Sequence, residues 1–326
     1  MPSVLIIGAG MAGLTAAREL AQHHWTVTVL DKGRGVGGRL ATRRIEQSRA
    51  DHGAQYFSAH TVDFQEHVRQ LMADGIVTEW NLQEAEIADT SFTHPRYIGT
   101  DGMNSIAKHL ARRIDVKTGE RAIRIVSYDG HCQVETESGG RFAADALLVT
   151  IPAPQAIALL RDSGIELAPA ELSAFSTISY QPCIAVMAVL NGPSRIPAPG
   201  AIHFEEGPIA WLADNRQKGI SPEQTSVTIH ASHSFSQAHL DDSDLNAVGR
   251  RLIDQAADWV PAEQVVTCQV HRWRYSLAEK RHSEAFLVGR ASFPLLFGGD
   301  GFGLGNVEGA FQSGLQMARW LITTKN

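Results

Sequence analysis

The sequence predicts an α/β fold in which a Rossmann-like dinucleotide-binding domain carries an inserted antiparallel-sheet domain. A strand, a glycine-rich turn and a helix open the chain, and the strand that follows ends in an acidic residue. From about residue 178 to residue 274 the pattern changes to short apolar or alternating runs with one long helix, which is typical of an antiparallel sheet and its covering helix. With 326 residues the chain exceeds one typical domain, so two domains are expected.

The N-terminal segment places a glycine-rich turn between a strand and a helix. The apolar run over residues 4–7 predicts the strand, Gly8-Ala-Gly10-Met-Ala-Gly13 forms the turn, and residues 14–22 continue as the helix. A second strand over residues 27–30 ends at Asp31, an acidic residue in the place that the dinucleotide fingerprint requires. The segment therefore predicts a dinucleotide-binding site.

Each position of this fingerprint has a physical task. The first glycine makes the tight turn, the second lets the backbone approach a pyrophosphate, and the third lets the helix pack close to the strand. The helix N-terminus attracts the phosphate charge, and the acidic residue accepts hydrogen bonds from a ribose diol. The predicted cofactor contacts in this segment are Gly8, Gly10, Met11, Ala12, Gly13 and Asp31.

A second cofactor element follows six positions after Asp31. Gly37-Gly38-Arg39 at this spacing resembles the FAD-binding glutathione-reductase-like superfamily, in its amine-oxidase branch. The resemblance implies that Arg39 contacts a phosphate and that the glycines, Gly38 among them, admit the extended body of the cofactor, with Lys32 in the same segment. The alternative is a basic surface loop over residues 32–39.

The C-terminal region supplies the third element. Residues 295–299 predict a strand, and a helix starts near Val307. Asp300, between them, can bind a ribityl or phosphate-side hydroxyl. The positive end of the helix would face the N1–C2=O edge of a flavin, where negative charge accumulates on reduction. Three separated segments thus converge on one ligand, and together they predict FAD.

The remaining pattern divides the chain into two interleaved domains. The expected elements outside the inserted sheet are helices over 62–72 and 102–111 and strands over 76–80, 91–98, 122–128, 132–136 and 146–150. The inserted sheet is expected to hold strands over 184–190, 201–204, 209–212, 227–231 and 265–273, with a helix over 242–259. We predict an FAD-binding domain over 1–72, 97–162 and 282–326 and a substrate domain over 73–96 and 163–281.

The composition is typical of a soluble globular protein. Apolar residues make up 44% of the chain and charged residues 20%, and the net charge of −6 gives no bulk reason to expect nucleic acid or an anionic membrane as partner. The three cysteines are scattered and form no CxxC motif, so neither a metal site nor a disulfide framework is expected, and a reducing cytoplasm is favoured. No apolar run approaches the ~18–20 residues of a membrane span. The apolar start is expected to be strand and turn rather than a signal peptide.

Several further segments narrow the resemblance. They are Asp51-His-Gly-Ala-Gln-Tyr-Phe57, Gly102-Met103, and residues 149–156, 211–216, 229–232, 271–275 and 307–314. With them the chain resembles bacterial renalase-type flavoproteins over most of its length. This resemblance implies noncovalent FAD and oxidation of the off-pathway 2- or 6-dihydro isomers of NAD(P) back to NAD(P)+, with O2 reoxidising the flavin to give H2O2. It also implies the architecture of p-hydroxybenzoate hydroxylase and the amine oxidases.

The implied reaction asks little of the protein side chains. Hydride transfer from a dihydronicotinamide ring to flavin N5 gains aromaticity and needs no general base, so the protein has only to position the ring and exclude competing chemistry. In keeping with this, the chain shows no Ser/His/Asp order, no HExxH motif and no paired carboxylates at catalytic spacing.

The narrower segments supply candidate substrate residues. The candidates for stacking on a ring are Tyr56, Phe57, Trp211 and Trp273, and those for holding a phosphate are Arg216 and Arg274. His230 lies on a predicted strand and is either a site residue or a satisfied buried histidine. The tryptophans have the alternative of core aromatics, and Arg216 that of loop surface. We take Tyr56, Arg216, His230 and Trp273 as the candidate catalytic residues.

The segment over residues 51–57 has a second expected role. In the family pattern it runs beside the flavin, so Gln55 and Tyr56 are expected to reach the N5/C4=O edge of the ring. The alternative is an ordinary loop closed by a turn at Asp51. His52 departs from the pattern, because relatives often have an apolar residue there.

Two other functions stay open. Residues 293–297 before Gly298 lack the Cys-Tyr pair that resembles the covalent attachment and aromatic cage of monoamine oxidases, which argues against covalent flavin and against amine recognition. An amine oxidase-like or desaturase-like FAD enzyme acting on another small reduced substrate would nevertheless share every FAD motif. A non-catalytic flavin-binding redox sensor would keep the same motifs and present a partner surface in place of a substrate cavity.

Overall fold

The computed structural model describes residues 1–82 and 94–325, which form two compact units. The first unit comprises Met1–Gly38, Ala107–Ser179 and Ala278–Asn326, and the second comprises Arg39–Ile106 and Tyr180–Leu277. This division differs from the predicted domain bounds in four places. Residues 39–72 and 97–106, expected with the cofactor-binding domain, group with the second unit, and residues 163–179 and 278–281, expected with the substrate domain, group with the first.

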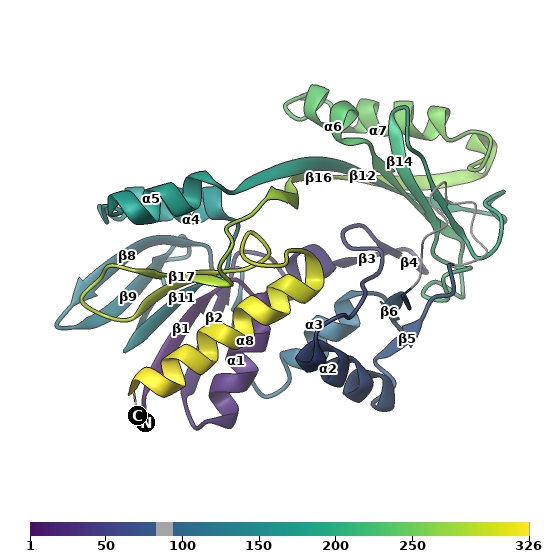
Figure 1. Ribbon diagram of the computed structural model, residues 1–326. Helices are drawn as coiled ribbons and strands as arrows, with labels where there is room; N and C mark the ends of the chain where they lie inside the picture. Colours follow the sequence, from purple (N-terminus) through teal and green to yellow (C-terminus); the bar gives the residue numbers. More distant parts are fainter. Residues whose placement is uncertain (83–93, 326) are drawn as a thin grey trace. The chain divides into compact units, whose positions relative to one another are not determined.

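A six-stranded sheet forms the centre of the first unit (Figure 1). Its strands, in spatial order, are β17 (Phe286–Gly289), β18 (Leu295–Gly298), β11 (Ala146–Val149), β1 (Ser3–Ile7), β2 (Thr26–Asp31) and β7 (Asp115–Thr118). All neighbours are parallel except the β17–β18 pair. The central strands read as unbroken apolar runs because a parallel sheet is covered on both faces, and Ile6, Leu147 and Leu296 are fully buried.

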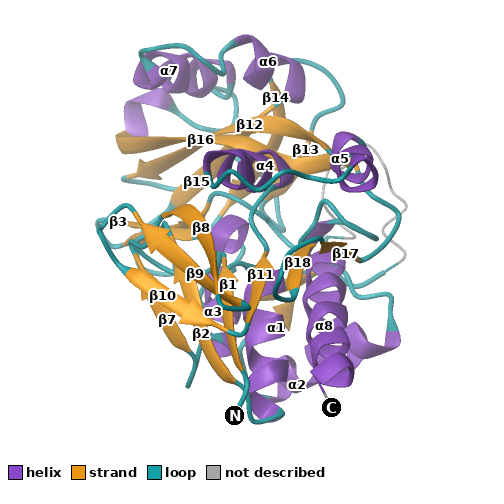
Figure 2. Ribbon diagram, turned by 90° about the vertical axis from the view of Figure 1, so that its left-hand side faces the viewer, coloured by secondary structure: helices purple, strands orange, loops and turns teal. Residues whose placement is uncertain are grey.

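Helices α1 (Met11–Gln22) and α8 (Asn306–Lys325) lie side by side in this unit, as Figures 1 and 2 both show. Their close approach depends on Gly314, where an added Cβ would overlap the carbonyl oxygen of Ala12. The unit also contains helices α4 (Ala153–Asp162) and α5 (Pro169–Ser176) and a three-stranded sheet of β8 (Ala122–Tyr128), β9 (His131–Thr136) and β10 (Arg141–Ala144). Strands β7, β10 and β17 and helices α4 and α5 are not anticipated by the sequence patterns.

The second unit is built on a five-stranded sheet with the order β13-β14-β15-β12-β16. Its strands are β12 (Ser179–Leu190), β13 (Ala201–His203), β14 (Ile209–Asp214), β15 (Ser226–Ala231) and β16 (Val265–Lys280). The β12–β15, β13–β14 and β14–β15 pairs are antiparallel. Helix α7 (Leu245–Gln255) packs Val248, Leu252 and Ile253 against the strands in one apolar core. The predicted antiparallel sheet with a covering helix is therefore confirmed, although α7 is shorter than predicted and a separate helix, α6 (His233–Ala238), precedes it.

Smaller elements complete the second unit. The hairpin of β3 (Thr42–Ile45) and β4 (Ser48–Asp51) contacts β15, where Ser226 Oγ donates to the carbonyl oxygen of Arg49 at 2.6 Å. This contact explains why residues 39–72 group here. The others are α2 (Val62–Ala73), the pair β5 (Val77–Glu79) and β6 (Tyr97–Gly99), and α3 (Asn104–Leu110), which crosses into the first unit. The strand predicted over 91–98 falls partly outside the described residues. Along the described part of the chain, no helix has the length and apolar composition of a membrane span.

Candidate functional site

The glycine turn of the first unit has the geometry that the fingerprint requires. Gly8 adopts φ +112°, a conformation that L side chains rarely adopt, and an added Cβ at Gly13 would overlap the carbonyl oxygen of Gly8. Thr150, at the end of β11, donates its hydroxyl to the carbonyl oxygens of Ile7 and Gly8 at 3.0 and 3.1 Å. Sequence reasoning missed Thr150, since a threonine ending a strand carries no signal of this contact.

The first turn of α1 is suited to bind an anion. Its N-cap is Gly10, which offers no side-chain hydrogen bond, and no acidic residue lies in the first turn. An added Cβ at Gly10 would meet nothing within 4 Å, so open space adjoins the backbone there. The first N–H groups of a helix have no partner within the helix, and Met11 and Ala12 begin this one. The residues present therefore fit a pyrophosphate.

Asp31 fastens the glycine turn to the loop that follows β2. Its Oδ2 accepts from the backbone N–H of Ala9 at 2.7 Å, and its Oδ1 accepts from that of Gly33 at 2.6 Å. Each carboxylate oxygen can accept a second hydrogen bond, so Asp31 keeps acceptors for the predicted contact with a ribose. The Gly37 N–H donates to the carbonyl oxygen of Ala9 at 2.8 Å. The loop thus folds back on the turn.

The C-terminal element lies in the same unit as the glycine turn. Asp300 follows β18 and is 7% exposed, and the N–H of the preceding Gly299 donates to Ser313 Oγ at 2.8 Å. Helix α8 begins at Asn306, one residue before the predicted start near Val307, and carries Glu308 buried in its first turn. The structure therefore brings together these candidates in one unit: Gly8, Gly10, Met11, Ala12, Gly13, Asp31, Lys32, Gly38, Asp300 and Val307.

Arg39 belongs to the second unit. Its Nη1 donates to the carbonyl oxygens of Tyr275 and Ser276 at 3.2 and 3.4 Å, and its Cζ lies 5.8 Å from the centre of the Tyr180 ring. An added Cβ at Gly53 would overlap the Arg39 carbonyl oxygen. Its contact with a phosphate stays a prediction.

Three candidate residues of the second unit bind one stretch of backbone, residues 51–53. Gln55 Nε2 donates to the carbonyl oxygens of Asp51 and Gly53 at 2.7 and 3.2 Å. His230 Nε2 and Trp273 Nε1 both donate to the carbonyl oxygen of His52, at 3.2 and 2.7 Å. These residues come from a loop, from β15 and from β16, and the short backbone segment holds them together.

A group of imidazoles surrounds this stretch. The His52 ring stacks on Trp273 with centroids 5.3 Å apart, and the ring of His271 meets both of them edge-on at 5.0 and 4.2 Å. Burial lowers the pKa of His52 to about 3 and that of His230 and His271 to about 4, with nearby positive groups adding to the effect. All three rings are therefore neutral near pH 7. Sequence reasoning flagged His52 only as a departure and missed His271.

Tyr56 lies in an aromatic group in the same unit. The centre of its ring is 5.7 Å from that of Trp211, and the Trp211 ring meets Trp80 edge-on at 6.3 Å. The Arg96 guanidinium lies 5.4 Å from the centre of the Tyr56 ring. Burial raises the pKa of Tyr56, and the charge of Arg96 offsets part of this rise. Trp211 is 7% exposed and packs as a core aromatic would.

The two arginine candidates lie outside the groups around His52 and Tyr56. Arg216 is exposed in the turn after β14, where its backbone N–H donates to Asp214 Oδ1 at 2.8 Å. Arg274 is exposed on β16 and forms an ion pair with Asp241 at 2.6 Å. The structure therefore does not bring either side chain into the groups around His52 or Tyr56.

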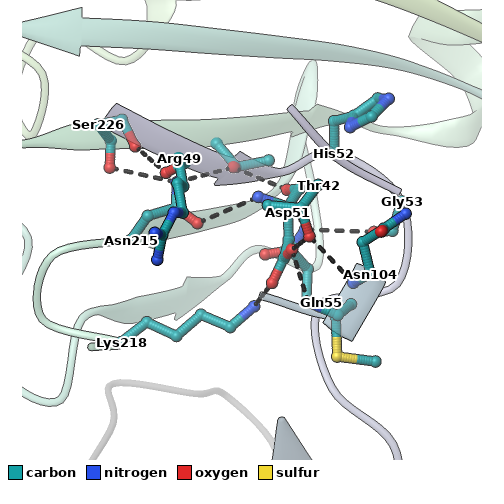
Figure 3. A network of polar contacts seen from close by, with 12 residues as sticks. Thr42, Arg49, Asp51, His52, Gly53, Gln55, Asn104, Asn215, Lys218 and Ser226 are labelled. Atoms are coloured by element: carbon teal, nitrogen blue, oxygen red, sulfur yellow. Dashed lines mark hydrogen bonds and ion pairs between the residues drawn. The ribbon is translucent and has the colours of Figure 1, made fainter. Parts of the chain in front are cut away.

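The first residue of the stretch 51–53, Asp51, belongs to a buried ion pair. Lys218 Nζ is 2.7 Å from Asp51 Oδ2, and neither side chain is exposed. Asp51 Oδ1 accepts from Thr42 Oγ1 at 2.5 Å and from the backbone N–H of Met103 at 2.9 Å. Figure 3 shows the Lys218 side chain extended towards Asp51, while the His52 ring points away from this network. Sequence reasoning identified neither partner as a site residue.

Metal and disulfide chemistry find no support in the described residues. No group of three or more His, Cys, Asp or Glu among them could hold a metal ion. Cys132, Cys183 and Cys268 are free thiols, and burial raises the pKa of Cys132 to about 11 and that of Cys183 to about 12.

Comparison with known proteins gives consistent matches. A family model described as NAD(P)-binding Rossmann-like domain matches residues 6–74, and one described as flavin containing amine oxidoreductase matches residues 83–322. The sequence is 26% identical to renalase of Mus musculus in an alignment 346 residues long, which covers 98% of this chain and 99% of that protein.

Solved structures share the fold. A putative protoporphyrinogen oxidase from Exiguobacterium sp. 255-15 matches with a TM-score of 0.77 at 14% identity, and covers 99% of each chain. Wild-type putrescine oxidase bound to putrescine matches with a TM-score of 0.71 at 15% identity, again over 99% of each chain. The predicted architecture, a Rossmann-like domain with an antiparallel-sheet domain as in the amine oxidases, is confirmed.

Proposed function

Because this chain belongs to the flavin-containing amine oxidoreductase family, and its cofactor is therefore FAD, we propose that it oxidises an isomeric 2- or 6-dihydro-NAD(P) to NAD(P)+ and reduces O2 to H2O2. The observation that carries the proposal is the similarity to mouse renalase, which extends over 98% of this chain. FAD, when bound, supplies the hydride acceptor at N5 and passes the electron pair to O2.

Residues of the first unit would hold the cofactor without a covalent bond. The open N-terminus of α1 would bind the pyrophosphate, with Gly10 leaving room for it. Asp31 would bind the ribose while holding the turn in shape. Asp300 and the start of α8 would contact the ribityl chain and the ring edge. We also keep the contacts of Lys32, Gly38, Arg39, Gln55 and Tyr56 with FAD as proposals.

The second unit supports a reaction that moves no proton through a strong base. His52, His230 and His271 are held neutral by burial, so they add no positive charge beside a ring that becomes a cationic pyridinium in the product. Trp273 and His230 are fixed by hydrogen bonds to His52 and would position a dihydronicotinamide ring. Because Arg216 is exposed, its proposed role is limited to a contact with the phosphates of the dinucleotide substrate.

The test is anaerobic mixing of the holoprotein with the 2-, 4- and 6-dihydro isomers of NAD(P), followed through the visible flavin band. We expect rapid bleaching by the 2- or 6-isomer, and bleaching slower by about a hundredfold with the 4-isomer, since a hydride-bearing carbon displaced by about 1 Å can cost that factor. Admission of air should then give H2O2. Bleaching by a simple amine such as putrescine, with none by any dihydronicotinamide, would establish the amine-oxidase alternative.

A non-catalytic redox sensor is the remaining alternative. It would bind FAD yet show no bleaching with the dihydronicotinamides or with amines. We place the protein in a reducing, cytoplasmic environment as part of the proposal, because its three cysteines are free thiols.

A further inference from the structure

The carbonyl oxygens of residues 51–53 are the common anchor of three proposed site residues. Gln55 binds the carbonyls of Asp51 and Gly53, and His230 and Trp273 bind that of His52. A shift of this backbone would therefore move the amide, the imidazole and the indole together. Whatever fixes the segment also fixes the relative positions of those side chains.

Asp51 ties the anchor to four separate parts of the second unit. Its carboxylate binds Lys218 in the turn after β14, Thr42 on β3 and the N–H of Met103 before α3. Its carbonyl oxygen also accepts from Thr228 Oγ1 of β15 at 2.8 Å. Of these four partners, all within the described residues, Lys218 is the charged one, and its ammonium group also lies 5.1 Å from the Trp80 ring.

A charge pair is a costly way to fill a protein interior. Each ion loses its hydration, and apolar residues of similar volume can be as stable or more stable, so such a pair is weak evidence for stability. What the pair provides here is a strong, directional bond to one end of the anchor. Arg49, two residues before Asp51 on β4, forms an ion pair with Asp101 at 2.8 Å. Because solvent reaches this pair, it constrains the backbone far less.

We propose that Asp51 and Lys218 are positioning residues, a buried ion pair that fixes the backbone of residues 51–53 and thereby the geometry of Gln55, His230 and Trp273. This inference rests on the proposed function, because those three residues are site residues only if it holds. Loss of Lys218 would leave the Asp51 carboxylate buried against two neutral donors. The carboxylate would then take up a proton or admit water, and the anchor would shift.

The test compares Lys218→Met with Asp101→Asn in the holoprotein. The first variant removes the buried ammonium group and keeps its volume, and the second removes the exposed pair on the same strand. One readout is hydrogen exchange of the Trp273 indole N–H, identified by its loss in Trp273→Phe, and it needs no substrate. The other is the limiting rate of flavin bleaching by the best dihydronicotinamide, measured beside the dissociation constants for FAD and substrate.

We expect Lys218→Met to accelerate indole exchange and to lower the limiting rate by about tenfold or more, with a smaller change in the FAD dissociation constant. Asp101→Asn should change neither. Wild-type indole exchange in folded Lys218→Met would overturn the inference.

If Lys218→Met does not fold, the double variant Asp51→Asn/Lys218→Met takes its place in the test, because it leaves no unpaired charge in the interior. The double variant should still show faster exchange than the wild type, and equal exchange would count against the pair. A wild-type protein that no dihydronicotinamide bleaches would refute the proposed function, and the indole readout would still decide whether the pair fixes the anchor.

Discussion

At the scale of single residues, Asp31 joins the glycine turn to the loop that follows β2. Its carboxylate accepts the N–H of Ala9 and that of Gly33, so it shapes the turn as well as offering acceptors to a ribose. The ribose contact by itself predicts that substitution of Asp31 lowers the affinity for FAD. The backbone contacts add a loss of order in the turn, which acts in the same direction.

We therefore expect Asp31→Ala to weaken FAD binding about ten- to hundredfold, since a hydrogen bond to a charged group contributes roughly 1.5–3 kcal/mol. The fold should survive, because Asp31 ends a strand and fills no core. FAD titration of the apoprotein measures this, with Asp115→Ala as control, a half-exposed aspartate on the neighbouring strand β7. An unchanged dissociation constant for Asp31→Ala would show that the fingerprint is misread.

The buried histidines predict how stability depends on pH. Their folded pKa values, about 3 for His52 and about 4 for His230 and His271, lie below the ordinary value of 6.5. As the pH falls from about 6.5 towards 4, the unfolded chain therefore binds protons that the folded chain does not, and stability decreases. It should be greatest above pH 6.5.

Thermal unfolding at pH 7 and pH 5 checks this. His52→Phe should reduce the loss of Tm between the two, while His233→Gln, at an exposed histidine on α6, should leave it unchanged. An equal loss in both variants would mean that other groups cause the acid sensitivity.

At the scale of elements, the junction of β1 and α1 separates cofactor binding from folding. Gly10 has φ −84°, which any residue can adopt, and an added Cβ there would meet no protein atom within 4 Å. The protein itself thus has no steric need for glycine at this position. The need arises only if a pyrophosphate approaches the backbone.

Gly10→Ala should accordingly lower FAD affinity at least about tenfold, while the apoprotein loses no more than about 1 kcal/mol for the poorer N-cap. Apoprotein denaturation and FAD titration measure the two effects separately. Gly35→Ala is the matched control, because its Cβ would also meet nothing within 4 Å and it lies outside the turn. Normal FAD binding by Gly10→Ala would place the pyrophosphate elsewhere.

At the scale of the whole molecule, two units share one chain that crosses between them several times. One unit contains the glycine turn, the acidic strand end and the C-terminal helix that we propose bind FAD, and the other contains the neutral imidazoles and the buried ion pair.

We expect the purified protein to be yellow and to release intact FAD on denaturation. The visible flavin absorbance of the supernatant after heat or acid precipitation measures this. Flavin that stays with the precipitate would contradict noncovalent binding. A colourless protein that FAD cannot reconstitute would remove the basis of the proposed function.

Much of the fold follows from local patterns in the sequence. The strand–turn–helix at the N-terminus, the apolar runs of the parallel sheet and the alternating runs of the second sheet each lie within one short segment, so periodicity and glycine spacing predict them. Short or polar elements escape this reasoning. The hairpin of β3 and β4, with sequences TRRI and SRAD, carries almost no apolar pattern and is a hairpin because it pairs with itself and packs on β15.

The turn after β14 shows what only the tertiary structure decides. Arg216 and Lys218 are two residues apart in one polar stretch, and by sequence alone both belong on the surface. Arg216 is exposed, whereas Lys218 is fully buried against Asp51, a residue 167 positions earlier in the chain. Local sequence determines how each short segment folds, because backbone conformation depends on near neighbours. The burial of a charge depends on a partner that only the folded chain brings within reach.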